Sequence, residues 1–330
     1  MLEHGGRLQR AVQHYGIARE RWLDLSSGIA PWSYAIPDIP LRAWARLPET
    51  DDGLEQAAAE YYRVNQVLPV AGSQAAIQAL PQLRARGTVG VLSPCYAEHA
   101  EGWRRARHQV LELQCEQVDD LLERLDVLVV VNPNNPTGCL LTAEQLLGWH
   151  ARLVQRGGWL LVDEAFIDNT PQHSIGAQAE RPGLIVLRSF GKFFGLAGVR
   201  LGFVLAEPAL LQRLAELLGP WTVSGPTRIL GQACLLDSAA HQQQIVRCAA
   251  ASQQLAALLS TAGFTPAGGC DLFQYLVTDQ AVQLYEFMAR RGILLRLFSQ
   301  PASLRFGLPA TEQDFQRLQQ AFNDYRKEQP

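Results

Sequence analysis

The chain has 330 residues, of which 48% are hydrophobic and 18% are charged. This composition excludes a disordered protein and, at about 150 residues per domain, suggests roughly two folded domains. The 29 basic and 32 acidic side chains give a formal net charge of −3 and are scattered along the chain. Such a charge pattern favours small-molecule ligands over nucleic acid or an anionic membrane surface.

The apolar runs are short, as in residues 127–131, and fall far below the roughly 18 residues needed to cross a bilayer. The first ten residues, MLEHGGRLQR, lack the hydrophobic segment of a secretory signal. We therefore expect a cytoplasmic protein with no membrane span. The six cysteines are widely spaced, with no C-x-x-C pair and no Cys/His cluster at zinc spacing, which predicts reduced thiols and no metal site.

In chain order, a short amphipathic helix is followed by a proline-rich stretch, residues 31–48. From about residue 51 to 215, helical periodicity alternates with short β-branched runs, which is typical of a mainly parallel sheet covered by helices. The predicted helices are 52–63, 73–86, 96–107 and 142–156. The predicted strands are 88–92, 109–113, 127–131, 159–163, 184–188 and 200–205. Ligands of such sheets bind where the carboxyl ends of the strands meet.

Beyond residue 226 the pattern changes to long helices rich in Ala, Gln and Leu, followed by a shorter α+β pattern. Its predicted elements are strand 273–277, helix 280–291, strands 293–297 and 303–306, and helix 312–325. We expect three parts: an N-terminal arm (1–47) that packs partly with the small domain, a large α/β domain (48–224) and a small α+β domain (225–330).

Two loops that follow predicted strands carry chemically useful side chains. Residues 132–138 (NPNNPTG) combine two prolines, which fix the backbone, with amide donors, but by themselves they fit an elaborate turn. Asp163 ends the apolar strand 159–163. A carboxylate in that position is either a cap or a functional group in a poorly hydrated cleft.

A third loop, residues 189–200 (SFGKFFGLAGVR), places Lys192 between glycines and aromatic residues. A surface lysine is usually a solubilising charge. Apolar neighbours can lower the pKa of such an amine, however, as an imine-forming lysine requires. Ser189 and Arg200 can supply a hydroxyl and a charge to a phosphate group.

Together, the motifs N-P-x-N-P-T-G, D-E-A-F and S-x-G-K and the downstream Arg200 resemble fold-type I pyridoxal 5′-phosphate (PLP) enzymes, specifically the histidinol-phosphate aminotransferase-like branch. The resemblance extends from the N-terminal arm to the last helix. It implies a fold-type I PLP-dependent transferase, with a large three-layer α/β/α lobe around a mainly parallel sheet and a smaller α+β lobe. It also implies a homodimer, because these enzymes usually place the active site at a dimer interface.

The resemblance implies a role for each residue of a cofactor site. Lys192 would bind PLP covalently, and Asp163 would pair with its pyridine nitrogen. Asn135 would donate to the phenolate oxygen O3′, and Tyr96 would stack on the ring, although an isolated tyrosine at a helix start is more often a core residue. The full predicted set, which includes a phosphate site at a helix start, is Gly72, Ser73, Gln74, Tyr96, Asn135, Asp163, Ser189, Lys192 and Arg200.

Within the branch, residues 3–6 (EHGG) and 23–31 (LDLSSGIAP) are most similar to threonine-phosphate decarboxylases of cobalamin synthesis. This implies that L-threonine O-3-phosphate is converted to (R)-1-amino-2-propanol O-2-phosphate and CO2. Arg305 would bind the substrate carboxylate and Arg296 its phosphate, although both fit surface positions equally well. The full predicted substrate set is His4, Ser27, Gly28, Ile29, Arg296 and Arg305.

Two residues depart from the aminotransferase pattern. Phe166 stands where a tyrosine commonly contacts O3′, which favours decarboxylation over transamination. Leu47 stands where a tyrosine often reaches the cofactor phosphate of the neighbouring subunit, which argues against that contact. A histidinol-phosphate or related aminotransferase remains the alternative, and a non-catalytic regulatory protein with the same fold is an alternative of another class. A nicotinamide dehydrogenase is disfavoured because no G-x-G-x-x-G opens the α/β region.

Overall fold

The structure, a computed structural model, describes residues 4–328. Two compact units divide it. Unit 1 comprises the described chain up to Trp32, Pro136–Cys139 and the chain from Gln244 onward, and unit 2 comprises Ser33–Asn135 and Leu140–Gln243. The boundaries thus fall after residues 32 and 243, whereas the sequence places them after 47 and 224. One reason is that α10 (Gly225–Leu236) packs on α3 (Leu54–Tyr62) inside unit 2.

Unit 2 is built on a seven-stranded sheet with the strand order β2-β8-β7-β6-β5-β3-β4. Only β8 runs antiparallel to its neighbours. The strands are β2 (Leu68–Val70), β3 (Thr88–Leu92), β4 (Gln109–Leu113), β5 (Val127–Val131), β6 (Trp159–Asp163), β7 (Leu184–Ser189) and β8 (Gly202–Leu205).

The six strands predicted for this region are present, and those at 88–92, 109–113, 127–131 and 159–163 have the predicted bounds. The sequence missed β2, because three residues give no periodic pattern and the second of them is Pro69. Since β2 lies at the edge of the sheet, a proline that cannot donate to a ladder is tolerated there.

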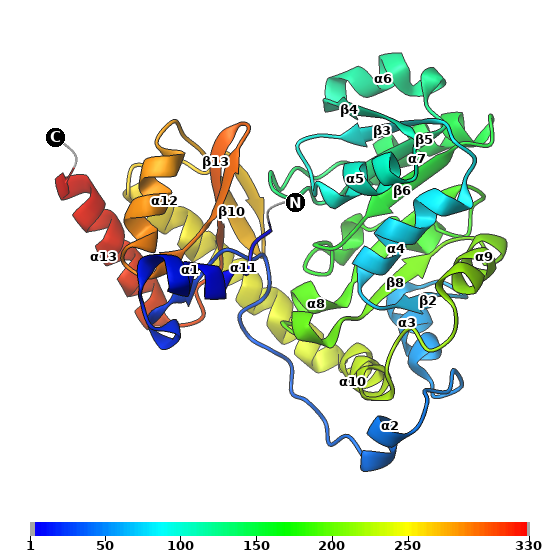
Figure 1. Cartoon of the computed structure of the whole chain (residues 1–330), viewed down its shortest axis with the longest axis horizontal. Helices are drawn as coiled ribbons and strands as arrows, with labels where there is room; N and C mark the ends of the chain where they lie inside the picture. Colours follow the sequence, from blue (N-terminus) through cyan, green and yellow to red (C-terminus); the bar gives the residue numbers. More distant parts are fainter. Residues whose placement is uncertain (1–3, 329–330) are drawn as a thin grey trace. The chain divides into compact units, whose positions relative to one another are not determined.

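Helices cover both faces of this sheet. Val127 and Val129 belong to an apolar cluster with residues of α4 (Ser73–Ala79), α5 (Glu98–Arg105) and α9 (Pro208–Leu218). The alternate residues Leu128 and Val130 point to the opposite face and are also buried. Helix α7 (Ala143–Val154) packs on β6, and Figure 1 shows α4 and α5 over one face of the sheet. The expected three-layer α/β/α arrangement is therefore present.

Unit 1 contains a four-stranded antiparallel sheet with the order β12-β13-β10-β9. Its strands are β9 (Gly268–Cys270), β10 (Phe273–Val277), β12 (Arg296–Ser299) and β13 (Ala302–Gly307). A separate parallel pair joins β1 (Leu23–Asp24) to β11 (Ile293–Leu294). The strand predicted at 293–297 is thus two strands, because its two halves pair with different partners.

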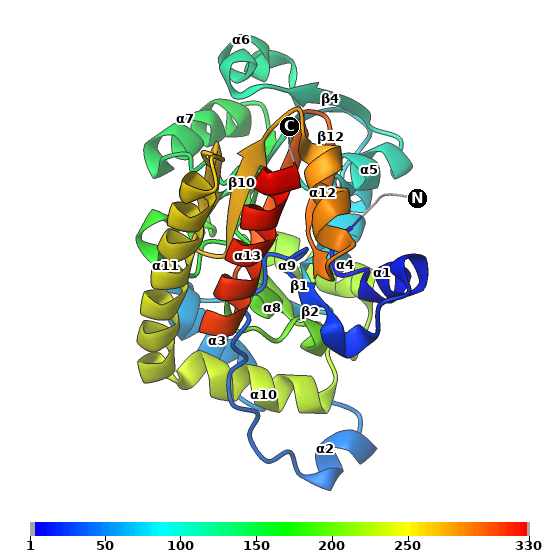
Figure 2. The same ribbon diagram turned by 90° about the vertical axis from the view of Figure 1, so that its left-hand side faces the viewer.

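The helices of unit 1 are α1 (Leu8–Tyr15), α12 (Ala281–Ala289), α13 (Glu312–Glu328) and most of α11 (Ser238–Thr261). Figure 2 shows α11, α13 and α12 side by side. Aromatic contacts connect this region. The ring centroid of Phe264, three residues after the end of α11, lies 5.7 Å from that of Phe322 on α13, and Phe287 on α12 lies 4.9 Å from Tyr325 on α13. Three short helices remain in unit 2: α2 (Leu41–Ala45), α6 (Val118–Leu121) and α8 (Phe190–Phe193).

Between residues 4 and 328, no helix has both the length and the apolar character needed to cross a membrane. The same part of the chain contains no group of three His, Cys, Asp or Glu side chains that could hold a metal ion. All six cysteines are free thiols.

Candidate active site

The carboxyl edge of the large sheet brings together the residues that the sequence assigns to the cofactor. Asp163 ends β6, and Asn135 lies in the loop after the neighbouring strand β5. Lys192 follows β7 in the short helix α8, and Tyr96 follows β3. Because β3, β5, β6 and β7 are parallel, their carboxyl ends meet at one edge, which is the usual place for ligands in such sheets.

Asp163 is buried and held by two hydrogen bonds. Its Oδ1 accepts from the backbone N–H of Ala165 at 3.0 Å, and its Oδ2 lies 2.8 Å from Nε2 of His99. Both side chains are almost completely buried, and Nδ1 of His99 has no hydrogen-bond partner among the described residues. The sequence interpretation missed His99. Its only signal is the three-residue spacing from Tyr96 at the start of α5, and the two rings lie 6.1 Å apart.

Lys192 is half-buried among aromatic side chains. Its Nζ lies 5.5 Å from the ring centroid of Phe166, and the adjacent Phe190 and Phe194 stack at 4.2 Å. A Cβ added to Gly191 would lie 2.6 Å from Cα of Ala197, so close packing fixes the course of this loop. Lys192 is also one of only two lysines in the whole chain, the other being the exposed Lys327.

A small cradle for an anion lies beside these groups. Gly72 has a φ of +75°, and a Cβ on it would lie 2.6 Å from Nη2 of Arg200, so glycine is required both by the backbone and by the close guanidinium. Gly202 lies opposite Ser189 in the β7–β8 ladder, and a Cβ on it would lie 2.6 Å from the backbone nitrogen of Ser73. Hydroxyl, backbone N–H and guanidinium donors thus converge, as a phosphate requires.

Tyr96 connects the cradle to the carboxylate. Its hydroxyl donates to Oε1 of Gln74 at 3.0 Å. Burial raises the pKa of Tyr96 to about 12, with further contributions from the charges of Glu98 and Asp163, while Arg200 opposes the shift. Tyr96, the buried carboxylate of Asp163 and the guanidinium of Arg200 therefore lie within electrostatic reach of one another, and Lys192 follows the neighbouring strand β7. This donor set fits a phosphorylated pyridine cofactor that carries an aldehyde.

A buried ionic cluster, which no sequence motif indicated, lies behind the same edge. Arg188, one residue before Ser189, donates from Nη1 to Oε2 of Glu164 at 3.1 Å and from Nη2 to Oδ1 of Asp168 at 2.5 Å. All three side chains are almost completely buried. Burial raises the pKa of the Glu164 carboxyl even though Arg188 opposes the shift. The cluster joins the end of β6 to the end of β7, the strands that carry Asp163 and Ser189.

Unit 1 holds a separate group of cationic side chains. Arg296 and Arg305 face each other in the β12–β13 ladder. Nη2 of Arg305 donates to the backbone oxygen of Ser26 at 2.9 Å, and its guanidinium lies 5.2 Å from the ring of Phe273. Burial, and then the charge of Arg296, lower the pKa of Arg305 to about 10. Two guanidinium groups that repel each other in a buried setting favour a bound anion.

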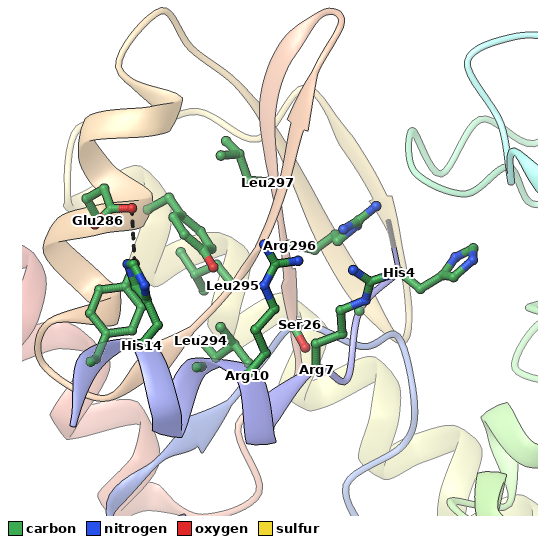
Figure 3. Close-up of a pocket in the computed structure, with 14 residues that line it drawn as sticks. His4, Arg7, Arg10, His14, Ser26, Glu286, Leu294, Leu295, Arg296 and Leu297 are labelled. Atoms are coloured by element: carbon green, nitrogen blue, oxygen red, sulfur yellow. Dashed lines mark hydrogen bonds between the residues drawn. The ribbon is translucent and has the colours of Figure 1, made fainter. Parts of the chain in front are cut away.

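A pocket of about 270 Å³ in unit 1 contains part of the predicted substrate set (Figure 3). His4 and Arg296 line it, whereas Ser27, Gly28, Ile29 and Arg305 are not among its lining residues. Ser26 lines the pocket in place of Ser27; its hydroxyl accepts from the Gly6 backbone at 2.8 Å and donates to Asp24 at 2.6 Å. The backbone oxygen of Ser27 instead lies against Gly307, where a Cβ would come within 2.3 Å.

Comparisons with known proteins assign the chain to a family. A family model described as aminotransferase class I and II matches residues 40–322. The chain is 60% identical to the threonine-phosphate decarboxylase of Pseudomonas aeruginosa, over 99% of both chains. It is 44% identical to a threonine-phosphate decarboxylase of Sinorhizobium sp, over 97% of both chains.

Solved structures share the fold. The histidinol-phosphate aminotransferase from Sinorhizobium meliloti in complex with pyridoxal-5′-phosphate matches with a TM-score of 0.84 at 17% identity, covering 98% of this chain and 96% of that chain. The L-threonine-O-3-phosphate decarboxylase from Porphyromonas gingivalis matches with a TM-score of 0.77 at 21% identity, covering 92% and 98%. The predicted fold-type I architecture is confirmed. The likeness in fold, the family model and the two full-length relatives agree: the chain belongs to the aminotransferase class I and II family.

Proposed function

We propose that this protein decarboxylates L-threonine O-3-phosphate in a PLP-dependent reaction, giving (R)-1-amino-2-propanol O-2-phosphate and CO2 for cobalamin biosynthesis. The observation that carries the proposal is the full-length similarity to the Pseudomonas aeruginosa threonine-phosphate decarboxylase. In the reaction the bond between Cα and the carboxylate carbon breaks, CO2 leaves, and Cα gains a proton. The amine and the phosphate ester remain in the product.

The cofactor is pyridoxal 5′-phosphate. When joined to an amino acid, its protonated ring withdraws electrons from the bonds at Cα. Lys192 would bind its aldehyde carbon, and the lysine amine, when free, would carry a proton to the substrate Cα. The Asp163 carboxylate, oriented by His99, would hold a proton on the pyridine nitrogen. Asn135 would donate to O3′.

The remaining residues of the cofactor site orient the ring and hold its phosphate. Tyr96 stacks on the ring, and its hydrogen bond to Gln74 fixes the tyrosine hydroxyl. Gly72 and Ser73 offer backbone N–H groups to the phosphate, and Ser189 and Arg200 add a hydroxyl and a charge, all within unit 2.

The substrate's two anionic groups bind to residues of unit 1. Arg305 binds the carboxylate, and its burial favours a bidentate ion pair with a planar group. Arg296 and His4 bind the phosphate from the pocket that both line. Ser27 and the backbone amides of Gly28 and Ile29 complete the substrate site.

Phe166 supports decarboxylation over transamination. The residues that would fix the substrate carboxylate and the cofactor ring would decide which bond at Cα breaks. The Phe166 ring is buried near the amine of Lys192 and offers no hydroxyl to O3′. Without a hydroxyl at position 166, only Asn135 and Asp163 among the predicted residues would tune the electronic state of the cofactor ring.

We also propose that the protein is a homodimer. Large apolar side chains are exposed on and around α2 of unit 2, among them Leu41, which is 80% exposed, and Trp44, which is 65% exposed. Ile36 and Leu47, which flank α2 in the chain, are also exposed. Exposed apolar residues in such numbers are typical of protein interfaces. We assign the dimer to the cytoplasm, where free thiols such as its six cysteines persist.

The proposal is tested by mixing purified protein with PLP and L-threonine O-3-phosphate and measuring CO2 together with the absorbance of the cofactor. We expect one CO2 per substrate consumed and no net change of the cofactor. Conversion of the cofactor to pyridoxamine 5′-phosphate by histidinol phosphate or glutamate, without CO2, would instead identify an aminotransferase. Absence of turnover with every phosphorylated amine tested would favour a regulatory protein.

A further inference from the structure

The pocket of unit 1 carries more positive charge than the residues assigned to the substrate. Arg7 and Arg10, neither of which belongs to the predicted substrate set, line it beside His4 and Arg296. Figure 3 shows the Arg7 and Arg10 side chains extending from α1 toward Arg296 and His4. Arg7 precedes the first residue of α1, and Arg10 follows three residues later.

The arrangement of α1 separates charge from packing. Arg7, Arg10 and His14 lie three and four residues apart, which places them along one side of the helix, and all three line the pocket. Ala11 is buried in an apolar cluster with Trp22, Ala289 and Leu294.

One carboxylate lines the pocket among the described residues, and it is already engaged. Oε1 of Glu286 accepts a hydrogen bond from the Tyr15 hydroxyl at 3.0 Å, on the side where α1 meets α12. Burial, followed by the hydrogen bond and the charge of Glu286, raises the pKa of Tyr15. Among its described lining residues the pocket thus brings together three guanidinium groups, the donors that suit a phosphate.

The size of the pocket fits a small phosphate ester. Its volume of about 270 Å³ is close to the lower end, about 300 Å³, of typical small-molecule sites. A phosphate monoester carries close to two negative charges at neutral pH and accepts hydrogen bonds through three oxygens. Three arginines and a histidine offer those oxygens more donors, from more directions, than one arginine and one histidine do.

We propose that Arg7 and Arg10 bind the phosphate of the substrate together with Arg296 and His4, and so make the enzyme selective for phosphorylated over unphosphorylated amino acids. The identity of the substrate in this inference rests on the proposed function. The group that the pocket would recognise is a phosphate dianion. Both the substrate and inorganic phosphate carry this group, so inorganic phosphate can serve as a probe.

The test uses the full-length variants R7Q and R10Q and the double variant, since glutamine keeps helix propensity while removing the charge. R19Q is the matched control, because Arg19 is an exposed arginine of the same unit that does not line the pocket. Steady-state kinetics give KM and kcat for L-threonine O-3-phosphate and for L-threonine. Calorimetry gives the affinity for inorganic phosphate without turnover.

We expect each single variant to raise KM for the phosphorylated substrate about tenfold, which corresponds to about 1.4 kcal/mol, with a larger effect in the double variant. The affinity for inorganic phosphate should fall in parallel, while kcat and the KM for L-threonine stay close to those of the unmodified protein. The variant R10K should retain most of the affinity, because it keeps the charge. R19Q should behave like the unmodified protein.

An unchanged KM and phosphate affinity in a double variant with native circular dichroism would overturn the inference. Equal losses with L-threonine and its phosphate would also overturn it, because phosphate selectivity would then be absent. If the unmodified protein released no CO2 from phosphorylated amino acids, the proposed function would fail, whereas the phosphate calorimetry would still decide whether Arg7 and Arg10 form an anion site.

Discussion

Nε2 of His99 lies 2.8 Å from Oδ2 of Asp163, and both side chains are almost completely buried. The histidine comes from the second residue of α5 and the carboxylate from the last residue of β6, so the pair connects a covering helix to the carboxyl edge of the sheet. A buried carboxylate keeps its position and its charge only when such donors surround it. We conclude that His99 orients the group expected to face the pyridine nitrogen.

Replacing His99 by leucine should weaken PLP binding about tenfold or more and lower kcat. The reason is that the Asp163 carboxylate loses the hydrogen bond from the His99 ring, and hydrogen bonds to charged groups are among the stronger ones. His99→Gln is the matched variant, since its amide can place a donor near the position of Nε2. We expect it to recover part of both losses. Titration of the apoenzyme with PLP, followed by absorbance, measures the affinity, and equal affinity in all three proteins would contradict the role of His99.

Lys192→Ala should abolish both the covalent attachment of PLP and the decarboxylation, because only an amine can bind the aldehyde carbon. Reduction with borohydride followed by peptide mapping should locate the cofactor on Lys192 alone. The chain supplies its own control, because Lys327 is the only other lysine and is exposed on α13. Lys327→Ala should keep full activity, and label on Lys327 in the native protein would refute the assignment.

Arg188→Met should destabilise the protein by about 3–5 kcal/mol, because it leaves Glu164 and Asp168 buried without their cation. The exposed pair of Arg104 and Glu112 offers a contrast. Arg104→Met should cost less than about 1 kcal/mol, since exposed ion pairs contribute little. Denaturant unfolding of both variants measures the difference, and similar losses would show that burial does not govern the cost.

Acid should weaken the attachment of α3 to α10. Arg228 donates two hydrogen bonds to the Asp52 carboxylate, at 2.7 and 2.6 Å. Burial alone would raise the pKa of Asp52, but these hydrogen bonds outweigh burial and lower the pKa below its usual value. A lowered folded-state pKa gives stability that is present above the unfolded value, about 3.9, and is lost as pH falls through the folded value.

Arg228→Met should therefore destabilise the protein at neutral pH, and its deficit should shrink as pH falls below about 4. Urea unfolding at a series of pH values measures this change. The control is Arg46→Met, which removes an exposed pair with Glu49 and should give a constant, small difference. A deficit for Arg228→Met that stays constant down to the lowest pH would exclude the Asp52 linkage.

The sequence alone was sufficient for six of the seven strands of the large sheet and for the cofactor residues expected at their ends. The runs 127–131 and 159–162 are continuously apolar because both faces of the sheet are covered, so they stand out in composition, and Asp163 and Lys192 follow from their places after apolar runs. The ordered motifs then identified the family.

Only the tertiary structure revealed the partners of these residues. In the sequence, His99 is indistinguishable from any other helix residue. The fold places it against Asp163, 64 positions away. Arg188 reads as a surface charge until Glu164 and Asp168 enclose it, and Arg7 and Arg10 read as the polar face of α1 until β12 brings Arg296 beside them. The physical reason is that local periodicity reports which side of an element is buried, whereas charge pairing depends on contacts between distant segments that no local pattern encodes.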